Sequence, residues 1–496
     1  MRFLQKTKKS FILLLGVGLI TLSCSDDFVS VNSEDENSED FFNSEADYQS
    51  ALIGAYDLLQ SSYINVMLGE IASNNTLAGG ESAIDVPGIQ EIDDMRHTPV
   101  NAQLRDIWSW MFAGVNRANY IMEFKDKTDF SGRDNVLGQT TFLRAYYYFE
   151  LVKFFGDVPL AVDKRLLFGD QNTVERTPAA EVYTQIELDL IFAADNLPVT
   201  QAEQGRVTKG AAQALLGRVY LYQGKYSLAA SVLDDVIETG PYSLVTDFST
   251  VFENDFENNS ESVFEIQYTD EQGAGFGCLQ CSEGNVAVGF NGPRNFNGPL
   301  FESGFSFNVP TEETYNAYDE SDLRRDIAIL NIQAFADANQ DYNDGAGVSW
   351  VEGFEHTGYF NRKYIPRQGD SNTGDQNLTN PNNYRAIRYA DVLLMAAEAH
   401  NEGTGNDALA RLYLNTVRER AGLEDVSAGG GELLEAIYLE RRLELVGEGH
   451  HFFDLVRTNR AEQDIEGFTT GKHELFPIPS VEIELAGNRW QQNPGY

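Results

Sequence analysis

The chain has 496 residues, of which 42% are hydrophobic and 12% aromatic, and its formal net charge at pH 7 is −40. This composition is typical of a globular protein with a substantial core, and the length suits one large domain or two ordinary ones. So strong a negative charge argues against a protein that binds nucleic acid or anionic lipid through a basic surface. It argues less against a polyanionic ligand, because an acidic protein can carry a local basic patch.

The first 23 residues have the layout of a secretory signal. Four basic residues with no acid among them precede the apolar run Phe11–Leu22, which ends in Ser23 before Cys24. The run is shorter than the roughly 20 residues that span a bilayer. A small residue before a cysteine is typical of a lipoprotein signal, so we predict a signal peptide at 1–23 and lipidation of Cys24. An ordinary signal with a chance cysteine is the alternative.

Residues 24–40 are polar and strongly acidic. Such a segment has too little apolar surface to fold by itself, so it is predicted to be a flexible tether. Residues 41–496 are predicted to form the folded part.

Two regions, at about residues 41–242 and 385–496, are predicted to form a mainly α-helical scaffold. Between Val136 and Phe154, apolar residues recur every three or four positions, the pattern of a buried helical stripe. Eroded helix pairs are expected at 46–60 with 102–124 and at 135–155 with 179–196.

One helix pair carries a repeat signature. Leu216, Gly217 and Tyr220, followed by Ala229 and Leu233, have the offsets of a tetratricopeptide repeat. Gly217 and Ala229 are expected to be small because the two helices cross closely there. Repeats of this kind provide scaffolds and binding surfaces rather than catalytic sites.

The region at about 243–384 has a different character. Gly, Asn, Asp and Ser are frequent, helical periodicity is patchy, and short alternating runs such as Ser262–Tyr268 suggest β-strands. A loop-rich insert of this length is expected to carry a function, and ligand binding on a rigid scaffold explains it best.

Several segments resemble those of the SusD/RagB family, and the resemblance covers nearly the whole chain. The segments are Cys24–Phe28, Thr141–Phe149, Phe155–Leu160, Arg388–Ala399, Leu414–Gly422, Glu440–Arg457, Leu475–Pro479 and Gln492–Tyr496. The resemblance implies a tetratricopeptide-like scaffold with a loop-rich glycan-binding part, and a protein that is not an enzyme and needs no cofactor. It also implies a lipid-anchored outer-membrane protein, facing the cell exterior, that delivers oligosaccharides to a SusC-like TonB-dependent transporter. The loop Ile71–Asn75 lacks the carboxylate that the family often has there.

A sugar ring offers an apolar C–H face on which an aromatic ring stacks, and a rim of hydroxyls that polar side chains bind. Aromatic residues in polar loops are therefore the candidates for sugar binding. Trp350 is the best candidate, and filling a loop core is its alternative role. The other predicted ligand-binding residues are Tyr342, Tyr359, Phe276, Phe296, Asn74, Asn75, Arg96 and Arg294, with Phe354 as a weaker neighbour of Trp350.

Three further patterns gave predictions. The alternating oxygen ligands of Asp337, Asn339, Asp341 and Asn343 suggest a structural Ca²⁺ site, although the spacing is not that of an EF-hand and a solvated acidic loop is the alternative. Cys278 and Cys281 are expected to form a small loop disulfide. The charged residues Arg144, Arg441, Arg442, Glu444, Asp454 and Arg457 are expected to form ion pairs that lock helices together, and His450 and His451 are expected to pack rather than to bind metal.

The leading hypothesis is non-catalytic capture of a glycan, expected to be neutral because the chain is acidic. A peptide-capture protein of the same architecture is the first alternative. A surface glycoside hydrolase or lyase is the second, although no catalytic motif supports it.

Overall fold

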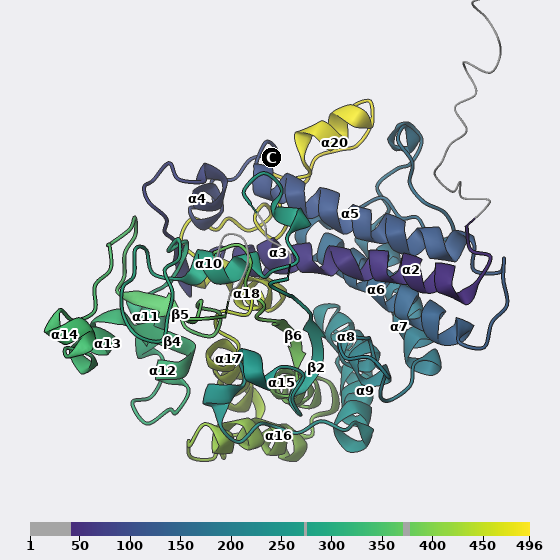
Figure 1. Ribbon diagram of the computed structural model, residues 1–496. Helices are drawn as coiled ribbons and strands as arrows, with labels where there is room; N and C mark the ends of the chain where they lie inside the picture. Colours follow the sequence, from purple (N-terminus) through teal and green to yellow (C-terminus); the bar gives the residue numbers. More distant parts are fainter. Residues whose placement is uncertain (1–40, 272–274, 371–376) are drawn as a thin grey trace, which may run out of the picture.

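The structure is a computed structural model that describes residues 41–271, 275–370 and 377–496. The predicted signal peptide, Cys24 and the tether lie outside these residues. The described part is mainly helical, and its strands are short (Figure 1). No helix among the described residues is long and apolar enough to cross a membrane.

The N-terminal half is an array of helices. Its helices are α2 (Glu45–Asp57), α3 (Tyr63–Ile71), α4 (Pro87–Asp93), α5 (Ala102–Glu123), α6 (Arg133–Phe155), α7 (Ala179–Asn196), α8 (Lys209–Tyr222) and α9 (Tyr226–Thr239). α2 packs on α5, α6 on α7, and α8 on α9, and α7 packs in turn on α8. The predicted scaffold of helix pairs is confirmed.

Helix α6 lies at the centre of this array, between α5 and α7. Almost every residue from Val136 to Phe155 is buried, not only those of the predicted stripe. The polar members of the helix are satisfied internally: the buried Arg144 forms an ion pair with Asp189 of α7, with a shortest N–O distance of 2.6 Å. A helix that is covered on all sides needs such partners, because an unpaired buried charge is strongly destabilising.

The predicted close crossing in the repeat pair is also confirmed. A Cβ atom on Gly217 of α8 would lie 2.5 Å from the side chain of Leu233 on α9. Ala229 is fully buried in the same contact region. Small residues are therefore required where these two helices meet.

The C-terminal helices continue the array. They are α15 (Tyr389–Ala399), a π-helical turn (His400–Thr404), α16 (Asp407–Arg420), α17 (Gly430–Glu444), α18 (His451–Arg457), α19 (Ala461–Asp464) and α20 (Ser480–Leu485). α15 packs on α9, α16 and α17, so the second helical region joins the first although about 150 residues separate them in the sequence. The fold is one continuous helical scaffold.

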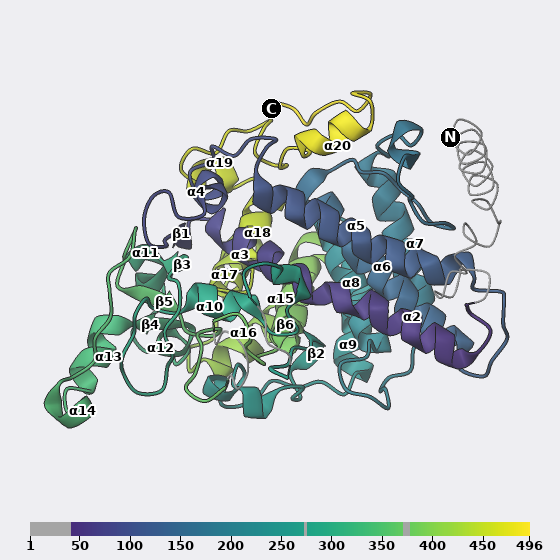
Figure 2. The same cartoon turned by 45° about the horizontal axis from the view of Figure 1, so that its top comes forward.

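The loop-rich region contains short helices and three two-stranded antiparallel sheets. The strands are β1 (Thr76–Ala78), β2 (Ser262–Ile266), β3 (Asn308–Pro310), β4 (Ile329–Asn331), β5 (Tyr359–Asn361) and β6 (Tyr384–Arg388), paired as β1–β3, β2–β6 and β4–β5. The helices are α10 (Val286–Asn291), α11 (Glu312–Asn316), α12 (Arg325–Ala328), α13 (Ile332–Ala338) and α14 (Tyr342–Gly345). α13 and α14 lie at the far end of this region from α2 and α7 (Figures 1 and 2).

The loop-rich region has a small hydrophobic core of its own, separate from the main core. Its buried residues are Phe296, Phe301, Val309, Leu330, Ile332, Phe360 and Ile365. We call it the second core. Strands β3, β4 and β5 each contribute to it, so residues that are distant in the sequence form it together.

Buried ion pairs join the loop-rich region to the scaffold. Arg388, at the end of β6, contacts Glu261, Glu444 and Glu448, with N–O distances of 2.5, 2.8 and 2.7 Å. Arg324 contacts Glu444 as well, at 2.8 Å. Both arginines and all three glutamates are buried. Arg441 with Asp391, and Arg457 with Glu398, extend the paired charges along α17 and α18, which confirms their predicted structural role.

Candidate functional site

A cavity of about 730 Å³ lies where the loop after α3 meets α4, α19 and the loop-rich region. This volume is within the usual range of ligand pockets, roughly 300–1,000 Å³. Figure 2 shows α4 and α19 at this end of the molecule. We call it the α4–α19 cavity. Its walls are Ser73, Asn74, Leu77, Ala83, Gln90, Asp93, Asp94, Arg96, Glu313, Phe354, Glu355 and residues 464–467.

Short backbone ladders hold two walls of the cavity together. Strand β1 pairs with β3, and the chain continues this pairing with Gly79 N–H donating to the Phe307 carbonyl at 2.9 Å. Phe354 N–H in turn donates to the Gly80 carbonyl, also at 2.9 Å. A Cβ atom on Gly353 would lie 2.5 Å from that carbonyl oxygen, so glycine is needed for this approach. These contacts fix the backbone of Phe354, whose half-buried side chain lines the cavity.

The cavity wall is strongly acidic. Six carboxylate residues line it and only one basic residue does, Arg96, which is paired with Asp94. The carboxylates are Asp93, Asp94, Glu313, Glu355, Asp464 and Glu466. Such a wall repels anionic ligands and presents acceptors to a ligand that is rich in hydroxyl groups.

Asp93 differs from the other acids of the wall. Desolvation raises the pKa of Asp93 to about 7, and the nearby charges of Asp94 and Glu355 raise it as well. The N–H of Ala78 donates to Asp93 Oδ2 at 2.8 Å, and this hydrogen bond lowers the pKa in part. At neutral pH this carboxyl group therefore exists in both protonation states.

This gives a prediction on stability. The pKa of Asp93 in the folded state lies above its unfolded-state value of about 3.9, so between these two pKa values the folded state binds a proton that the unfolded state has lost. The contribution of Asp93 to the free energy of unfolding therefore falls as the pH rises from about 4 to above 7. Asp93→Asn keeps an oxygen that accepts the hydrogen bond from the N–H of Ala78. It is expected to raise the free energy of unfolding by about 1–2 kcal/mol at pH 8, a value reduced to allow for the partial exposure of the side chain, and to leave it unchanged at pH 4. Urea unfolding at both pH values measures this. The exposed Asp126→Asn is the control, and an equal gain at pH 4 would contradict the explanation.

The structure brings two of the predicted ligand-binding residues into the α4–α19 cavity, namely Asn74 and Arg96, together with Phe354. Asn75 is fully buried below the wall and accepts a hydrogen bond from Arg442 Nε at 2.7 Å, so it positions that arginine. Arg294 lies near Asp85, on the neighbouring loop, at 3.4 Å.

The other predicted residues lie away from this cavity. Phe296 is buried in the second core, and Trp350 packs against that core with its side chain half-exposed, which supports the alternative role considered for the indole. Tyr342 is half-exposed on α14, and Tyr359 stacks on Tyr315 with ring centroids 4.7 Å apart. Phe276 is 63% exposed and close to Phe305. Contact of these five residues with a ligand stays a prediction.

Several residues of the cavity carried no signal in the sequence. Leu77, Asp93 and residues 464–467 are themselves neither aromatic nor part of a recognised motif. They become neighbours only when α19, near the C-terminus, packs beside α4. A pairing of segments about 370 positions apart has no local pattern that could reveal it.

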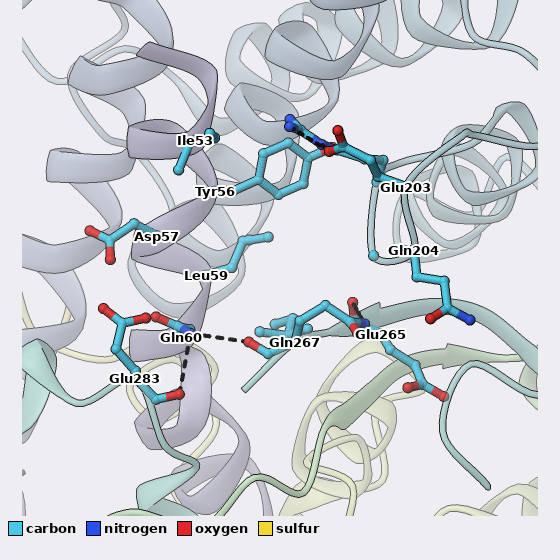
Figure 3. Close-up of a pocket in the computed structure, with 13 residues that line it drawn as sticks. Ile53, Tyr56, Asp57, Leu59, Gln60, Glu203, Gln204, Glu265, Gln267 and Glu283 are labelled. Carbon is cyan, nitrogen blue, oxygen red and sulfur yellow. Dashed lines mark hydrogen bonds and ion pairs between the residues drawn. The ribbon is translucent and has the colours of Figure 1, made fainter. Parts of the chain in front are cut away.

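A second cavity, of about 430 Å³, lies between α2, the loop at 203–206 and β2 (Figure 3). Its walls combine amides and carboxylates with the apolar side chains of Ile53 and Leu59, and Gln60 Nε2 donates to the carbonyls of Gln267 and Glu283 at 3.1 and 3.3 Å. The guanidinium of Arg206 lies over one face of the Tyr56 ring, 5.3 Å from its centroid. The cavity is also smaller than the α4–α19 cavity, so it is the weaker candidate.

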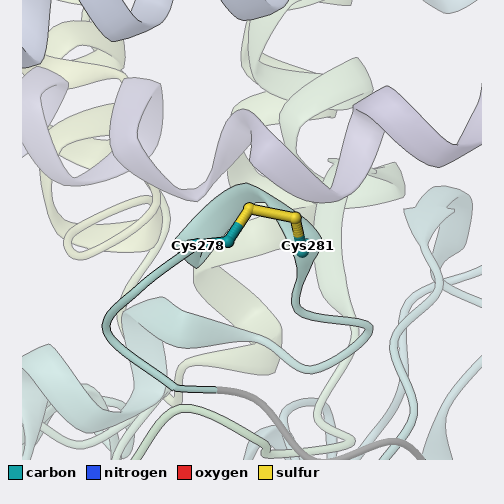
Figure 4. Close-up of a disulfide and its surroundings, with 2 residues drawn as sticks. All are labelled: Cys278 and Cys281. Carbon is teal, nitrogen blue, oxygen red and sulfur yellow. A yellow bond between two sulfur atoms is a disulfide. The ribbon is translucent and has the colours of Figure 1, made fainter. Parts of the chain in front are cut away.

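The predicted disulfide is confirmed: Cys278 and Cys281 are bonded and close a tight turn of the loop-rich region (Figure 4).

Among the described residues, no group of three or more His, Cys, Asp or Glu side chains is placed to hold a metal ion. The predicted Ca²⁺ ligands lie on and between α13 and α14, where Asn339 Nδ2 donates to the Phe335 carbonyl at 2.8 Å. These residues are Asp337, Asn339, Asp341 and Asn343, and the Ca²⁺ site stays a prediction.

The adjacent histidines pack as expected. Burial lowers the pKa of His450 and of His451 to about 3, so both imidazoles are neutral at physiological pH. Asn74 Oδ1 accepts a hydrogen bond from His451 Nε2 at 3.0 Å. This hydrogen bond fixes Asn74 at the edge of the α4–α19 cavity.

Comparisons with known proteins agree with this architecture. A family model described as the SusD family matches residues 251–474, and one described as "Starch-binding associating with outer membrane" matches residues 27–221. SusD-like protein P2 of Formosa agariphila is 27% identical, over 99% of this chain and 100% of that protein.

Two solved structures are informative. A laminarin binding SusD-like protein is 36% identical, with a TM-score of 0.84 over 92% of this chain and 100% of that chain. Surface glycan-binding protein A from Bacteroides thetaiotaomicron, in complex with laminarihexaose, is 28% identical, with a TM-score of 0.81 over 90% of this chain and 99% of that one. These relatives are named as binding proteins, and the chain is likewise not an enzyme. It belongs to the SusD family.

Proposed function

We propose that this protein captures a neutral β-1,3-linked glucan of the laminarin class, and that the α4–α19 cavity binds it. The observation that carries the proposal is the combination, in one large cavity, of an aromatic ring with a wall of hydrogen-bond acceptors. The laminarin and laminarihexaose named for the two solved relatives supply the ligand class.

The cavity matches the two surfaces of a glucose residue. The ring of Phe354 and the side chain of Leu77 offer apolar contact to the C–H face. The amide N–H groups of Asn74 donate hydrogen bonds at the hydroxyl rim, and the carboxylates of Asp94 and Asp464 accept them. A uronate or sulfate group would meet several negative charges, so the cavity favours an uncharged glucan.

We also propose where the protein works. The signal and Cys24 would place it in the outer membrane through a lipid, facing the cell exterior, where it delivers the glucan to a SusC-like TonB-dependent transporter. The description of the matching family model, which names the outer membrane, supports this assignment. Mass spectrometry of the mature N-terminus tests acylation, and co-purification from membranes tests the partnership.

Trp350 gives a separate prediction. If its half-exposed indole stacks on the glycan as the sequence predicts, Trp350→Ala weakens laminarihexaose binding by about tenfold, since aromatic anchors dominate contact energetics. Isothermal titration calorimetry measures the change. An unchanged affinity would assign the indole to the second core alone.

Affinity electrophoresis against a panel of polysaccharides tests the proposed function. We expect retardation in laminarin and none in alginate or a sulfated galactan. Binding to a peptide mixture with no retardation in any glycan would instead favour the peptide-capture alternative.

A further inference from the structure

A smaller cavity, of about 220 Å³, adjoins the α4–α19 cavity. The two cavities have two lining residues in common, Asn74 and Asp464. The smaller one is bounded by α17 and α18, and we call it the α17–α18 cavity. The segment at 460–467, which contains α19, lines both cavities, so they meet along it.

The α17–α18 cavity offers both kinds of contact that a sugar needs. Leu439 of α17 is 47% exposed at its edge and offers an apolar contact there. Beside it, the ring of Tyr438 carries the guanidinium of Arg460, 4.4 Å from the ring centroid. The guanidinium of Arg460 covers one face of that ring, so Leu439 is the main apolar contact of this wall.

Arg442, in the polar wall of this cavity, is held in place by neighbouring residues. Arg442 Nε donates to Asn75 Oδ1 at 2.7 Å and Nη2 lies 3.6 Å from Glu313, whereas Nη1 has no hydrogen-bond partner among the described residues. Its guanidinium, with 17% of the side chain exposed, therefore keeps a free donor in the wall of the α17–α18 cavity. A guanidinium donor suits a sugar hydroxyl.

We infer that the two cavities form one continuous groove, and that the α17–α18 cavity binds the sugar residues that follow those held in the α4–α19 cavity. This inference rests on the proposed function, because it extends the same glycan across the wall formed by Asn74 and Asp464. The groove would make the protein selective for chain length. Short oligosaccharides fill one cavity, while longer ones gain the contacts of the second without a second loss of translational freedom.

The test compares laminaritriose with laminarihexaose by isothermal titration calorimetry. The wild-type protein is expected to bind the hexaose about tenfold more tightly than the triose. Leu439→Glu places a hydrated charge on the apolar edge, so it is expected to weaken hexaose binding about fivefold and to leave triose binding within about twofold. Arg460→Gln is a second variant of the same cavity with the same expected pattern.

Leu412→Glu is the matched control, because Leu412 is also an exposed leucine, 58% exposed, on the neighbouring helix α16 and lines neither cavity. It is expected to bind both oligosaccharides as the wild type does. Wild-type affinity for the hexaose in both Leu439→Glu and Arg460→Gln would overturn the inference and leave the proposed function intact. A wild-type protein that binds neither oligosaccharide would overturn both.

Discussion

Phe354→Ala is expected to weaken laminarihexaose binding by at least about tenfold, because it removes the one aromatic ring that lines the α4–α19 cavity. The loss should appear mainly as faster dissociation, since contacts inside a pocket act on the off-rate more than on the on-rate. Isothermal titration calorimetry gives the affinity and surface plasmon resonance the rates.

A matched control shows whether the loss is specific. Phe168 is 92% exposed and does not line the cavity, so Phe168→Ala removes the same group at a site without a proposed role. It is expected to bind as the wild type does. Equal affinities for wild type and Phe354→Ala would place the glucan elsewhere on the molecule.

The second large effect concerns the buried charges that join the loop-rich region to the scaffold. Arg388→Met is expected to lower the free energy of unfolding by about 3 kcal/mol, because it removes the cation that the buried Glu261, Glu444 and Glu448 share. Each glutamate keeps one other cationic partner or more, which places the loss at the low end for a broken buried pair. Urea unfolding followed by circular dichroism measures this. Arg117→Met is the control: Arg117 pairs with Asp57 at the exposed surface, and its loss is expected to cost less than about 1 kcal/mol.

The same cluster gives this effect a pH dependence. Burial alone would raise the pKa of Glu444, but Arg420, Arg388 and Arg324 outweigh it and hold the pKa well below its usual range. A depressed folded-state pKa stabilises the protein above the unfolded-state value, near 4, and this stabilisation is lost as the pH falls further. The gap in stability between wild type and Arg388→Met should therefore narrow below pH 4. A gap that stays constant down to pH 3 would show that lost packing, not charge, is the cause.

The scaffold could be predicted from the sequence because its signals are local. The apolar period of α6 and the small residues Gly217 and Ala229 report contacts with the next turn or the next helix. The paired charges on α17 and α18 were recognisable for a related reason, since so many Arg and Glu residues on apolar helices can be accommodated only in pairs. The apolar stripe of α6 predicts one buried face, and it does not reveal that the opposite face of the helix is buried as well.

The ligand site was less predictable, and Trp350 and Phe354 illustrate why. Both are aromatic residues in the same polar loop, and their sequence surroundings favoured Trp350. The second core forms only when β3, β4 and β5 come together, and it takes up much of the indole, whereas Phe354 is carried onto the cavity wall by its pairing with Gly80. The sequence identifies aromatic residues in loops, but not which of them the fold covers.

The central claim is that the acidic α4–α19 cavity recognises a neutral glucan. Calorimetric titration of the purified protein with laminarin, and separately with alginate of similar length, tests it most directly. We predict saturable binding of laminarin that Phe354→Ala weakens and no heat of binding with alginate. Tighter binding of alginate, or laminarin binding that Phe354→Ala leaves unchanged, would contradict the claim.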